Sequence, residues 1–187
     1  MVNNKKWLSL RHFVTKEYLN NIYMGQQAYG ICNTDLKTNG LLEDLDECTI
    51  FASTLPRSTQ TVEYILSEFK NINFNVKFSD NLIERGLGDF EGKQKSIIRK
   101  DAHFFRNEKF IIERTPPNGE PFERFCSRVS EEVEFMKNEF KYKNILVVSH
   151  LQVLRMIRFC MLDYHNFTEW HNINYKHGEI VRECYGE

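Results

Sequence analysis

Apolar residues along the chain gather in short runs, and longer stretches in which they recur every three or four positions lie between these runs. Four short runs stand out: WLSL (7–10), CTIFAS (48–53), FNVKFS (74–79) and NILVVS (144–149). Each is bounded by polar or turn residues, which is typical of buried strands. We therefore predict four strands.

The stretches between the strands carry the periodicity of amphipathic helices. STQTVEYILSEFK (58–70) and ERFCSRVSEEVEFMKNEF (123–140) each place their apolar side chains on one face, and LQVLRMIRFCML (151–162) is apolar nearly all round. Three helices are therefore predicted. Near the end of the chain, the pattern of INYKHGEIVREC (173–184) favours a β-hairpin about His177 and Gly178.

Strands that alternate with helices are typical of an α/β domain, and we predict a three-layer αβα sandwich with a mostly parallel central sheet. The length of 187 residues suits one domain with a substantial core, and no repeat or low-complexity linker divides it. We therefore expect residues 1–187 to form a single domain. In such sheets ligands bind beyond the carboxyl ends of the strands.

Composition excludes several classes of function. The net charge of −1 gives no global field that would collect nucleic acid or anionic lipid, so we expect neither as a partner. The apolar run behind the first lysines is too short for a signal peptide, and no stretch is long enough to cross a bilayer. Five widely spaced cysteines match neither a zinc site nor a disulfide scaffold, and they indicate reduced thiols in the cytoplasm.

Basic and imidazole side chains follow three of the predicted strands. Arg11 and His12 come directly after the first strand, Arg57 comes four residues after Ser53 at the end of the second, and His150 follows the last. Each of them alone is commonly a solvated or capping residue. Because parallel strands end at one edge of the sheet, their joint placement indicates an anion site there.

The motifs that contain these residues resemble those of the histidine phosphatase superfamily, the phosphoglycerate-mutase-like proteins. LRHFVT (10–15) is similar to the family's Arg-His-Gly-x-Thr signature, and STLPRSTQTV (53–62) is similar to its Ser-x-Leu-x-Arg-x-x-Gln-Thr-Ala element. LIERGLGDFEGK, PPNGEPFERFCSRV and ILVVSHLQVLR resemble three further landmarks in the family's order. The resemblance spans about residues 8–155.

The resemblance implies a histidine acid-type phosphatase that hydrolyses phosphomonoesters without a metal or other cofactor. It implies that His12 attacks phosphorus to form a phosphohistidine and that Glu84 is the proton donor. Arg11 and Arg57 are expected to hold the phosphoryl oxygens as planar forks and to keep His12 neutral. His150 is expected to become a protonated donor when the substrate dianion is bound.

Two smaller contributions to substrate binding are also expected, from Thr15 and from the backbone N–H of Leu151 at a helix start. A small phosphorylated molecule is the expected partner, and a phosphoprotein is a possible one. For Glu84, the alternative to the acid role is a salt bridge to Arg85. Gln152 either reaches the site or is solvated.

The sequence departs from the family's pattern at several positions. Phe13 replaces the signature glycine, which predicts either a narrowed pocket or a shifted His12. Tyr18 lies where family members often carry an asparagine that contacts phosphate. Leu151 and Gln152 replace two small residues after the last histidine.

The segment between Glu84 and the PPNGE motif is predicted to be a variable lid, at about residues 93–120. Within it, residues 93–114 contain seven Lys or Arg against three Asp or Glu, with aromatic residues interleaved. One interpretation is a basic lid that prefers polyanionic or bulky substrates. The other is a solvated amphipathic helix whose inward residues are Ile97, Ile98, Phe104 and Phe105.

Three other functions remain open from the sequence. A mutase would return the phosphoryl group to another hydroxyl of a sugar acid, and a non-catalytic protein would keep the basic clamp but lack turnover. A metal-dependent hydrolase is disfavoured because His165, His171 and His177 lack the close spacing of a metal site, so no metal is expected.

Overall fold

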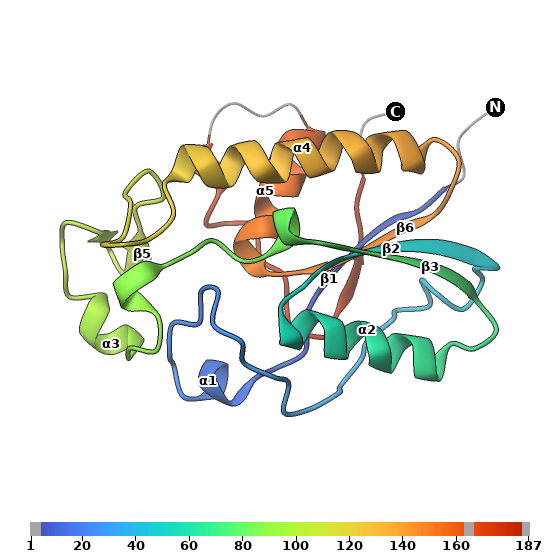
Figure 1. Cartoon of the computed structure of the whole chain (residues 1–187), viewed down its shortest axis with the longest axis horizontal. Helices are drawn as coiled ribbons and strands as arrows, with labels where there is room; N and C mark the ends of the chain where they lie inside the picture. The colour runs from blue at the N-terminus through green and yellow to red at the C-terminus, as the bar shows by residue number, and fades with distance from the viewer. Residues whose placement is uncertain (1–4, 163–166, 185–187) are drawn as a thin grey trace.

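The computed structural model describes residues 5–162 and 167–184 (Figure 1). Its main sheet has five strands in the order β3-β2-β6-β1-β7. The strands are β1 (Trp7–Arg11), β2 (Glu47–Ser53), β3 (Asn73–Ser79), β6 (Ile145–Ser149) and β7 (Ile180–Arg182). The first four are mutually parallel, and β7 runs antiparallel to β1 at one edge.

Helices cover both faces of this sheet. The helices are α1 (Lys16–Leu19), α2 (Pro56–Glu68), α3 (Lys95–Ile98), α4 (Phe122–Phe140) and α5 (Leu151–Met161), with short 3-10 turns η1 (Asp80–Leu82), η2 (Gly88–Phe90) and η3 (Phe167–Glu169). Figure 1 shows α4 and α5 on one side of the sheet and α2 on the other. The predicted three-layer αβα sandwich and all four predicted strands are confirmed.

Alternate residues of the strands contribute to two separate cores. Trp7 and Val147 pack against α4 and α5, whereas Leu8 and Val148 pack against α2. A parallel strand covered by helices on both faces buries side chains in both directions, which explains why these strands are nearly continuous apolar runs. The polar residues that end them therefore gather at one edge of the sheet.

The segment predicted as a lid contains α3 and a two-stranded sheet formed by β4 (Phe105–Arg106) and β5 (Lys109–Phe110). Phe104 and Phe105 are buried in a small apolar cluster with Leu87 and Phe90, but Ile97 is 64% exposed. The cluster lies beside the main sheet rather than within its two cores.

The predicted hairpin about His177 and Gly178 is wrong. His177 makes a parallel bridge to Arg11, and only the residues after Gly178 form a strand, which pairs with β1. The free edge of β1 offers a ladder partner that two short local strands could not match, so tertiary pairing replaces the local turn. As a result, His177 lies at the end of β1.

No helix formed by the described residues is both long and apolar enough to span a bilayer.

Candidate active site

A cavity of about 350 Å³ is lined by residues at or shortly after the carboxyl ends of β1, β2 and β6, and by loop and lid residues. Five of the predicted residues line it: Arg11, His12, Arg57, Glu84 and Leu151, which begins α5. His150 is fully buried and is not among the lining residues, but its ring centroid lies 5.1 Å from that of His12. The structure thus brings together side chains that lie far apart in the sequence.

His12 is held in one tautomer by its own neighbour. The ring Nδ1 lies 2.6 Å from the carbonyl oxygen of Phe13. A carbonyl oxygen only accepts hydrogen bonds, so Nδ1 carries the proton and Nε2 keeps its lone pair. Burial, reinforced by the positive charges of Arg57 and Arg11, holds the pKa of His12 well below 6.5. The ring is therefore a neutral nucleophile at physiological pH.

Arg57 is buried at the first turn of α2, and all three of its nitrogens are bonded. NH1 and NH2 donate to the carbonyl oxygens of Gln27 at 2.8 Å and Gly25 at 2.7 Å, and Nε donates to Nδ1 of His150 at 3.2 Å. Each terminal nitrogen keeps a second N–H for a ligand. Burial lowers the pKa of Arg57 to about 10, so it stays charged at neutral pH.

Arg11 approaches the cavity at the end of β1. Its NH1 donates to the carbonyl oxygen of Tyr175 at 3.2 Å, and Cζ lies 5.4 Å from the ring centroid of Tyr18. Its Nε is buried and has no hydrogen-bond partner among the described residues. Burial lowers the pKa of Arg11 to about 10, which leaves it a cation.

The structure holds His150 neutral. Because Arg57 can only donate, Nδ1 of His150 accepts, and Nε2 then donates to Oγ of Ser53 at 2.8 Å. Burial and the charges of Arg57 and Arg11 hold the pKa of His150 well below 6.5. Protonating Nδ1 would break the bond to Arg57, so the donor role expected of His150 in the complex stays a prediction.

Glu84 faces the cavity from the segment after η1. Its Oε1 accepts from the backbone N–H of Arg85 at 3.0 Å, and Oε2 lies 3.5 Å from the backbone nitrogen of Gln152. Burial raises the pKa of Glu84 above 4.5 despite these bonds. A raised pKa is what a proton donor requires.

Arg85 makes no ion pair with Glu84 in the described structure. Its guanidinium donates instead to three backbone carbonyl oxygens, those of Ile112, Arg114 and Glu120. Arg85 therefore holds the backbone of residues 112–120, the last part of the predicted lid segment.

Of the two smaller substrate contacts expected, the structure places Leu151 at the cavity but not Thr15. Thr15 is buried and does not line the cavity, because its Oγ caps α1 by accepting from the N–H of Tyr18 and contacts Sδ of Met24. Leu151 does line the cavity, and so does Gln152, whose Oε1 is buried without a partner among the described residues. Gln152 therefore reaches the site and does not simply point into solvent.

Phe13 points away from the cavity. Its ring packs edge-on against Tyr64, with the centroids 5.3 Å apart, and its backbone N–H donates to Oγ1 of Thr61. Gly178 lies beside the ring: its φ is +73°, and a Cβ there would overlap the carbonyl oxygen of Asp35 and lie 3.1 Å from Cδ1 of Phe13. Phe13 is therefore a core residue and does not narrow the cavity.

Two aromatic neighbours of the site were not assigned to it from the sequence. Nδ1 of His177 donates to the carbonyl oxygen of His12 at 2.7 Å, and the two rings are 4.9 Å apart. Tyr18 contacts His177 edge-on and lies under the cations of Arg11 and Lys95. Burial lowers the pKa of His177 to about 3, so it adds no charge beside the nucleophile.

Basic residues of the lid segment also line the cavity, namely Lys95, Arg99 and Lys109. Arg155, one turn beyond Leu151 on α5, adds a further guanidinium to the lining. Basic side chains of the segment therefore line the cavity, and the preference of a basic lid for polyanionic or bulky substrates stays a prediction.

The described residues contain no group of three or more His, Cys, Asp or Glu placed to hold a metal ion. His171 and His177 are hydrogen-bonded to different partners. Nε2 of His171 bonds the carbonyl oxygen of Phe110, and Nδ1 of His177 bonds that of His12. His165, the third histidine of that set, lies outside the described residues.

Comparison with known proteins gives relatives along most of the chain. A sequence profile of the histidine phosphatase superfamily (branch 1) matches residues 37–185. An adenosylcobalamin/alpha-ribazole phosphatase of Escherichia coli (strain K12) is 25% identical over 174 residues, which cover 88% of this chain and 82% of that protein. A phosphoglycerate mutase of Schizosaccharomyces pombe is 29% identical over 126 residues, which cover 65% of this chain and 58% of that protein.

Solved structures share the fold. An alpha-ribazole phosphatase from Shigella flexneri superposes with a TM-score of 0.70 at 21% identity, covering 94% of this chain and 88% of that one. A mycobacterial glucosyl-3-phosphoglycerate phosphatase gives 0.76 at 17% identity, covering 97% and 98%. Some of these relatives are named phosphatases and one is named a mutase, and the chain belongs to the histidine phosphatase superfamily, branch 1.

Proposed function

We propose that the protein hydrolyses phosphomonoesters through a phosphohistidine on His12, with Glu84 as the proton donor and without a metal ion. One observation carries the proposal: the bond from Nδ1 of His12 to the Phe13 carbonyl leaves the Nε2 lone pair of a neutral ring in a cavity lined by Arg11 and Arg57. A nucleophile and the countercharge for a phosphoryl group are what this reaction requires.

The first half-reaction forms a P–N bond and breaks the P–O ester bond. Nε2 of His12 attacks phosphorus, and the departing ester oxygen takes a proton from the carboxyl of Glu84. Arg11 and Arg57 hold the equatorial oxygens, where negative charge is spread in the transition state. The alcohol leaves, and the phosphoryl group stays on His12.

The second half-reaction reverses the role of the carboxylate. Water attacks phosphorus, Glu84 accepts its proton, and the P–N bond breaks to release inorganic phosphate and neutral His12. The raised pKa of Glu84 suits a group that must be protonated in one step and ionised in the next.

The substrate is proposed to be a small phosphorylated molecule, with a phosphorylated side chain of a protein as a second possibility. Lys95, Arg99, Lys109 and Arg155 line the cavity beyond the two arginines that face His12, which favours esters that carry further negative charge. Hydrolysis is favoured over mutase chemistry because the phosphatase of Escherichia coli matches 88% of this chain, whereas the mutase of Schizosaccharomyces pombe matches 65%.

Trapping the intermediate tests the proposal. After mixing with an aryl phosphate and acid-free quenching, mass spectrometry should find a phosphoryl adduct on His12 that is lost in acid. His12→Asn should abolish both adduct and turnover, whereas His103→Asn, at an exposed histidine outside the cavity lining, should keep both. Turnover should survive a chelator. Phosphate binding by the wild type without any turnover would instead indicate a non-catalytic binder.

A phosphoglycerate mutase is the competing enzymatic function, because one relative carries that name. The same preparation should be incubated with 3-phosphoglycerate and a bisphosphate primer. We expect release of inorganic phosphate. Isomerisation without net release would show that the phosphoryl group returns to an alcohol.

A further inference from the structure

The segment that carries Glu84 lies outside the main sheet and is held by side chains. The backbone carbonyls of residues 81–84, in η1 and directly after it, have no strand partner, and each of them accepts a hydrogen bond from a side chain. Arg128 donates to the carbonyl oxygens of Asn81, Ile83 and Glu84, and Oγ of Ser149 donates to that of Leu82. Buried carbonyls of irregular segments need such partners, so these contacts decide where the segment lies.

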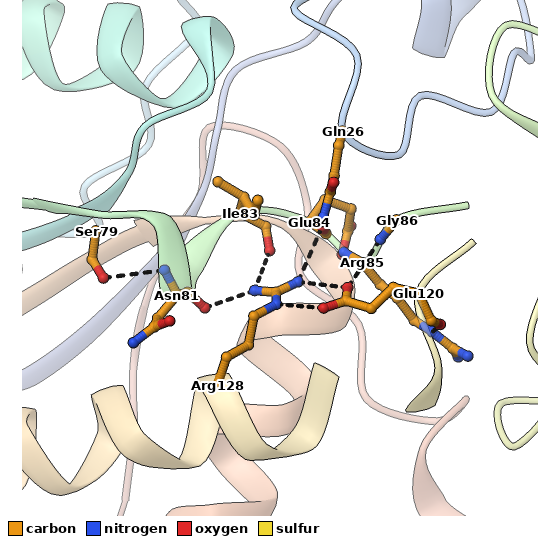
Figure 2. Close-up of polar contacts among 9 residues, drawn as sticks. All are labelled: Gln26, Ser79, Asn81, Ile83, Glu84, Arg85, Gly86, Glu120 and Arg128. Atoms are coloured by element: carbon orange, nitrogen blue, oxygen red, sulfur yellow. Dashed lines mark hydrogen bonds and ion pairs between the residues drawn. The ribbon is translucent and has the colours of Figure 1, made fainter. Parts of the chain in front are cut away.

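Arg128 uses all five of its N–H donors on this arrangement (Figure 2). NH1 bonds two of the carbonyls at 2.7 and 2.8 Å, and NH2 bonds the third at 3.2 Å. The remaining donors form a fork with Glu120, Nε to Oε1 at 2.7 Å and NH2 to Oε2 at 2.9 Å. No donor remains for a substrate, and Arg128 does not line the cavity.

Glu120 completes the arrangement on the other side of Glu84. Its Oε2 accepts from the backbone N–H of Gly86 at 3.1 Å, and its own N–H donates to the carbonyl of Gly86 at 2.9 Å. The side chains of Arg128 and Glu120 are 13% and 9% exposed. The segment from residue 81 to residue 86 is thus bonded to one ion pair on both sides of the proton donor.

We infer that the Arg128–Glu120 pair is the positioning device of the proton donor, and this inference rests on the proposed role of Glu84. The pair sets the backbone of residues 81–86 and, through it, the distance from the Glu84 carboxyl to the departing oxygen. A lysine cannot replace the arginine, because a single ammonium cannot bond three carbonyls and a carboxylate in a planar fork.

The nucleophile is positioned by different contacts. His12 is fixed by its own ring bond to Phe13 and by the backbone bond of its N–H to the carbonyl of Ser149. Loosening residues 81–86 should therefore impair protonation of the leaving group and spare the attack on phosphorus.

The test compares esters that need the proton with one that does not. Three variants are assayed on two substrates: Arg128→Lys, Glu120→Gln and Glu84→Gln. One substrate is p-nitrophenyl phosphate, whose phenolate leaves without a proton. The other is an alkyl phosphate, whose leaving oxygen must be protonated. A displacement of 1 Å costs on the order of 100-fold, so we expect about a 10- to 100-fold loss of kcat/KM on the alkyl ester. On the aryl ester the loss should be within about threefold, because general acid catalysis contributes little there.

Arg124 supplies the matched control. It lies one turn earlier on α4 and is exposed. Arg124→Lys should leave both esters unaffected. Thermal melting identifies any variant that has lost its fold, and because Glu120→Gln keeps both the size and a hydrogen-bonding head, it provides the measurement if Arg128→Lys does not fold.

The outcomes separate the inference from the proposed function. Selective loss on the alkyl ester in Glu84→Gln and in the Arg128 or Glu120 variants supports both. Selective loss in Glu84→Gln alone, with equal or no loss in the other two, overturns the positioning role only. If Glu84→Gln itself loses activity equally on both esters, Glu84 is not the proton donor, and both conclusions fall.

Discussion

Phe13 occupies the position of the signature glycine, and its substitution tests whether this departure impairs the site. The ring is fully buried, packs edge-on against Tyr64 and lies against Gly178, outside the cavity lining. We therefore expect Phe13→Ala and Phe13→Gly to destabilise the fold and not to raise activity.

The size of the effect follows from complete burial. Removing a buried phenylalanine ring typically costs about 3–5 kcal/mol in the free energy of unfolding, from lost transfer energy and the cavity left behind. In a domain of this length each kcal/mol lowers Tm by about 2–4 °C, so Phe13→Ala should lower Tm by about 6–20 °C. Phe13→Leu keeps most of the apolar volume and should cost less than about 1.5 kcal/mol.

Denaturant unfolding followed by circular dichroism measures the stability, and hydrolysis of an aryl phosphate at a temperature where every variant is folded measures kcat/KM. The reasoning is refuted if Phe13→Gly loses less than about 1 kcal/mol, well below the range for a buried ring. It is equally refuted if kcat/KM rises tenfold or more, about 1.4 kcal/mol of barrier, because the ring would then obstruct the site.

Two further predictions concern pH and substrate charge. Burial lowers the pKa of His12 below 6.5 and raises that of Glu84 above 4.5, so the nucleophile stays neutral in mild acid whereas the proton donor is lost as pH rises. The pH profile of kcat/KM on an alkyl phosphate should fall on its alkaline side, Glu84→Gln should remove that fall, and an acid limb centred near 6.5 would contradict the assignment. Lys95, whose Nζ lies 5.2 Å from the Tyr18 centroid in the cavity wall, should bind a second anionic group. Lys95→Gln should raise KM about 3- to 10-fold for esters with such a group and leave KM for phenyl phosphate unchanged, and added salt should weaken this difference. The same substitution at Lys100, which is exposed, is the control. An equal change in KM for both esters would rule out this role of Lys95.

The parts of the site that could be predicted from the sequence are those set by a single strand. Arg11, His12 and His150 follow apolar runs directly, so the run that predicts the strand also predicts the edge at which the side chain lies. Arg57 follows the same logic through the helix that begins at Pro56. The periodicity likewise gave the layers of the fold, because a strand covered on both faces has to be apolar on both.

Charge states and orientations depend on partners that the local pattern does not contain. The pattern predicts that His150 lies at the edge of the sheet. It does not predict that the two ring nitrogens of His150 are hydrogen-bonded to Arg57 and Ser53. The signature likewise predicts that Thr15 contacts the substrate, but in the structure the hydroxyl of Thr15 caps α1. Hydrogen bonds that close only in the folded chain decide both outcomes.

His177 shows why the remaining part was missed. It lies 165 residues from His12, to whose carbonyl it donates, and its contact exists only because the terminal segment pairs with β1 instead of forming a hairpin. The glycine after it adopts a φ of +73°, and the same glycine leaves room for the ring of Phe13. Phe13 and His177 are thus packed around the same glycine: a Cβ at residue 178 would overlap the carbonyl oxygen of Asp35 and would lie 3.1 Å from Cδ1 of Phe13. The bulky residue after His12 leaves the cavity open because its ring packs against Tyr64, beside a glycine that has no side chain.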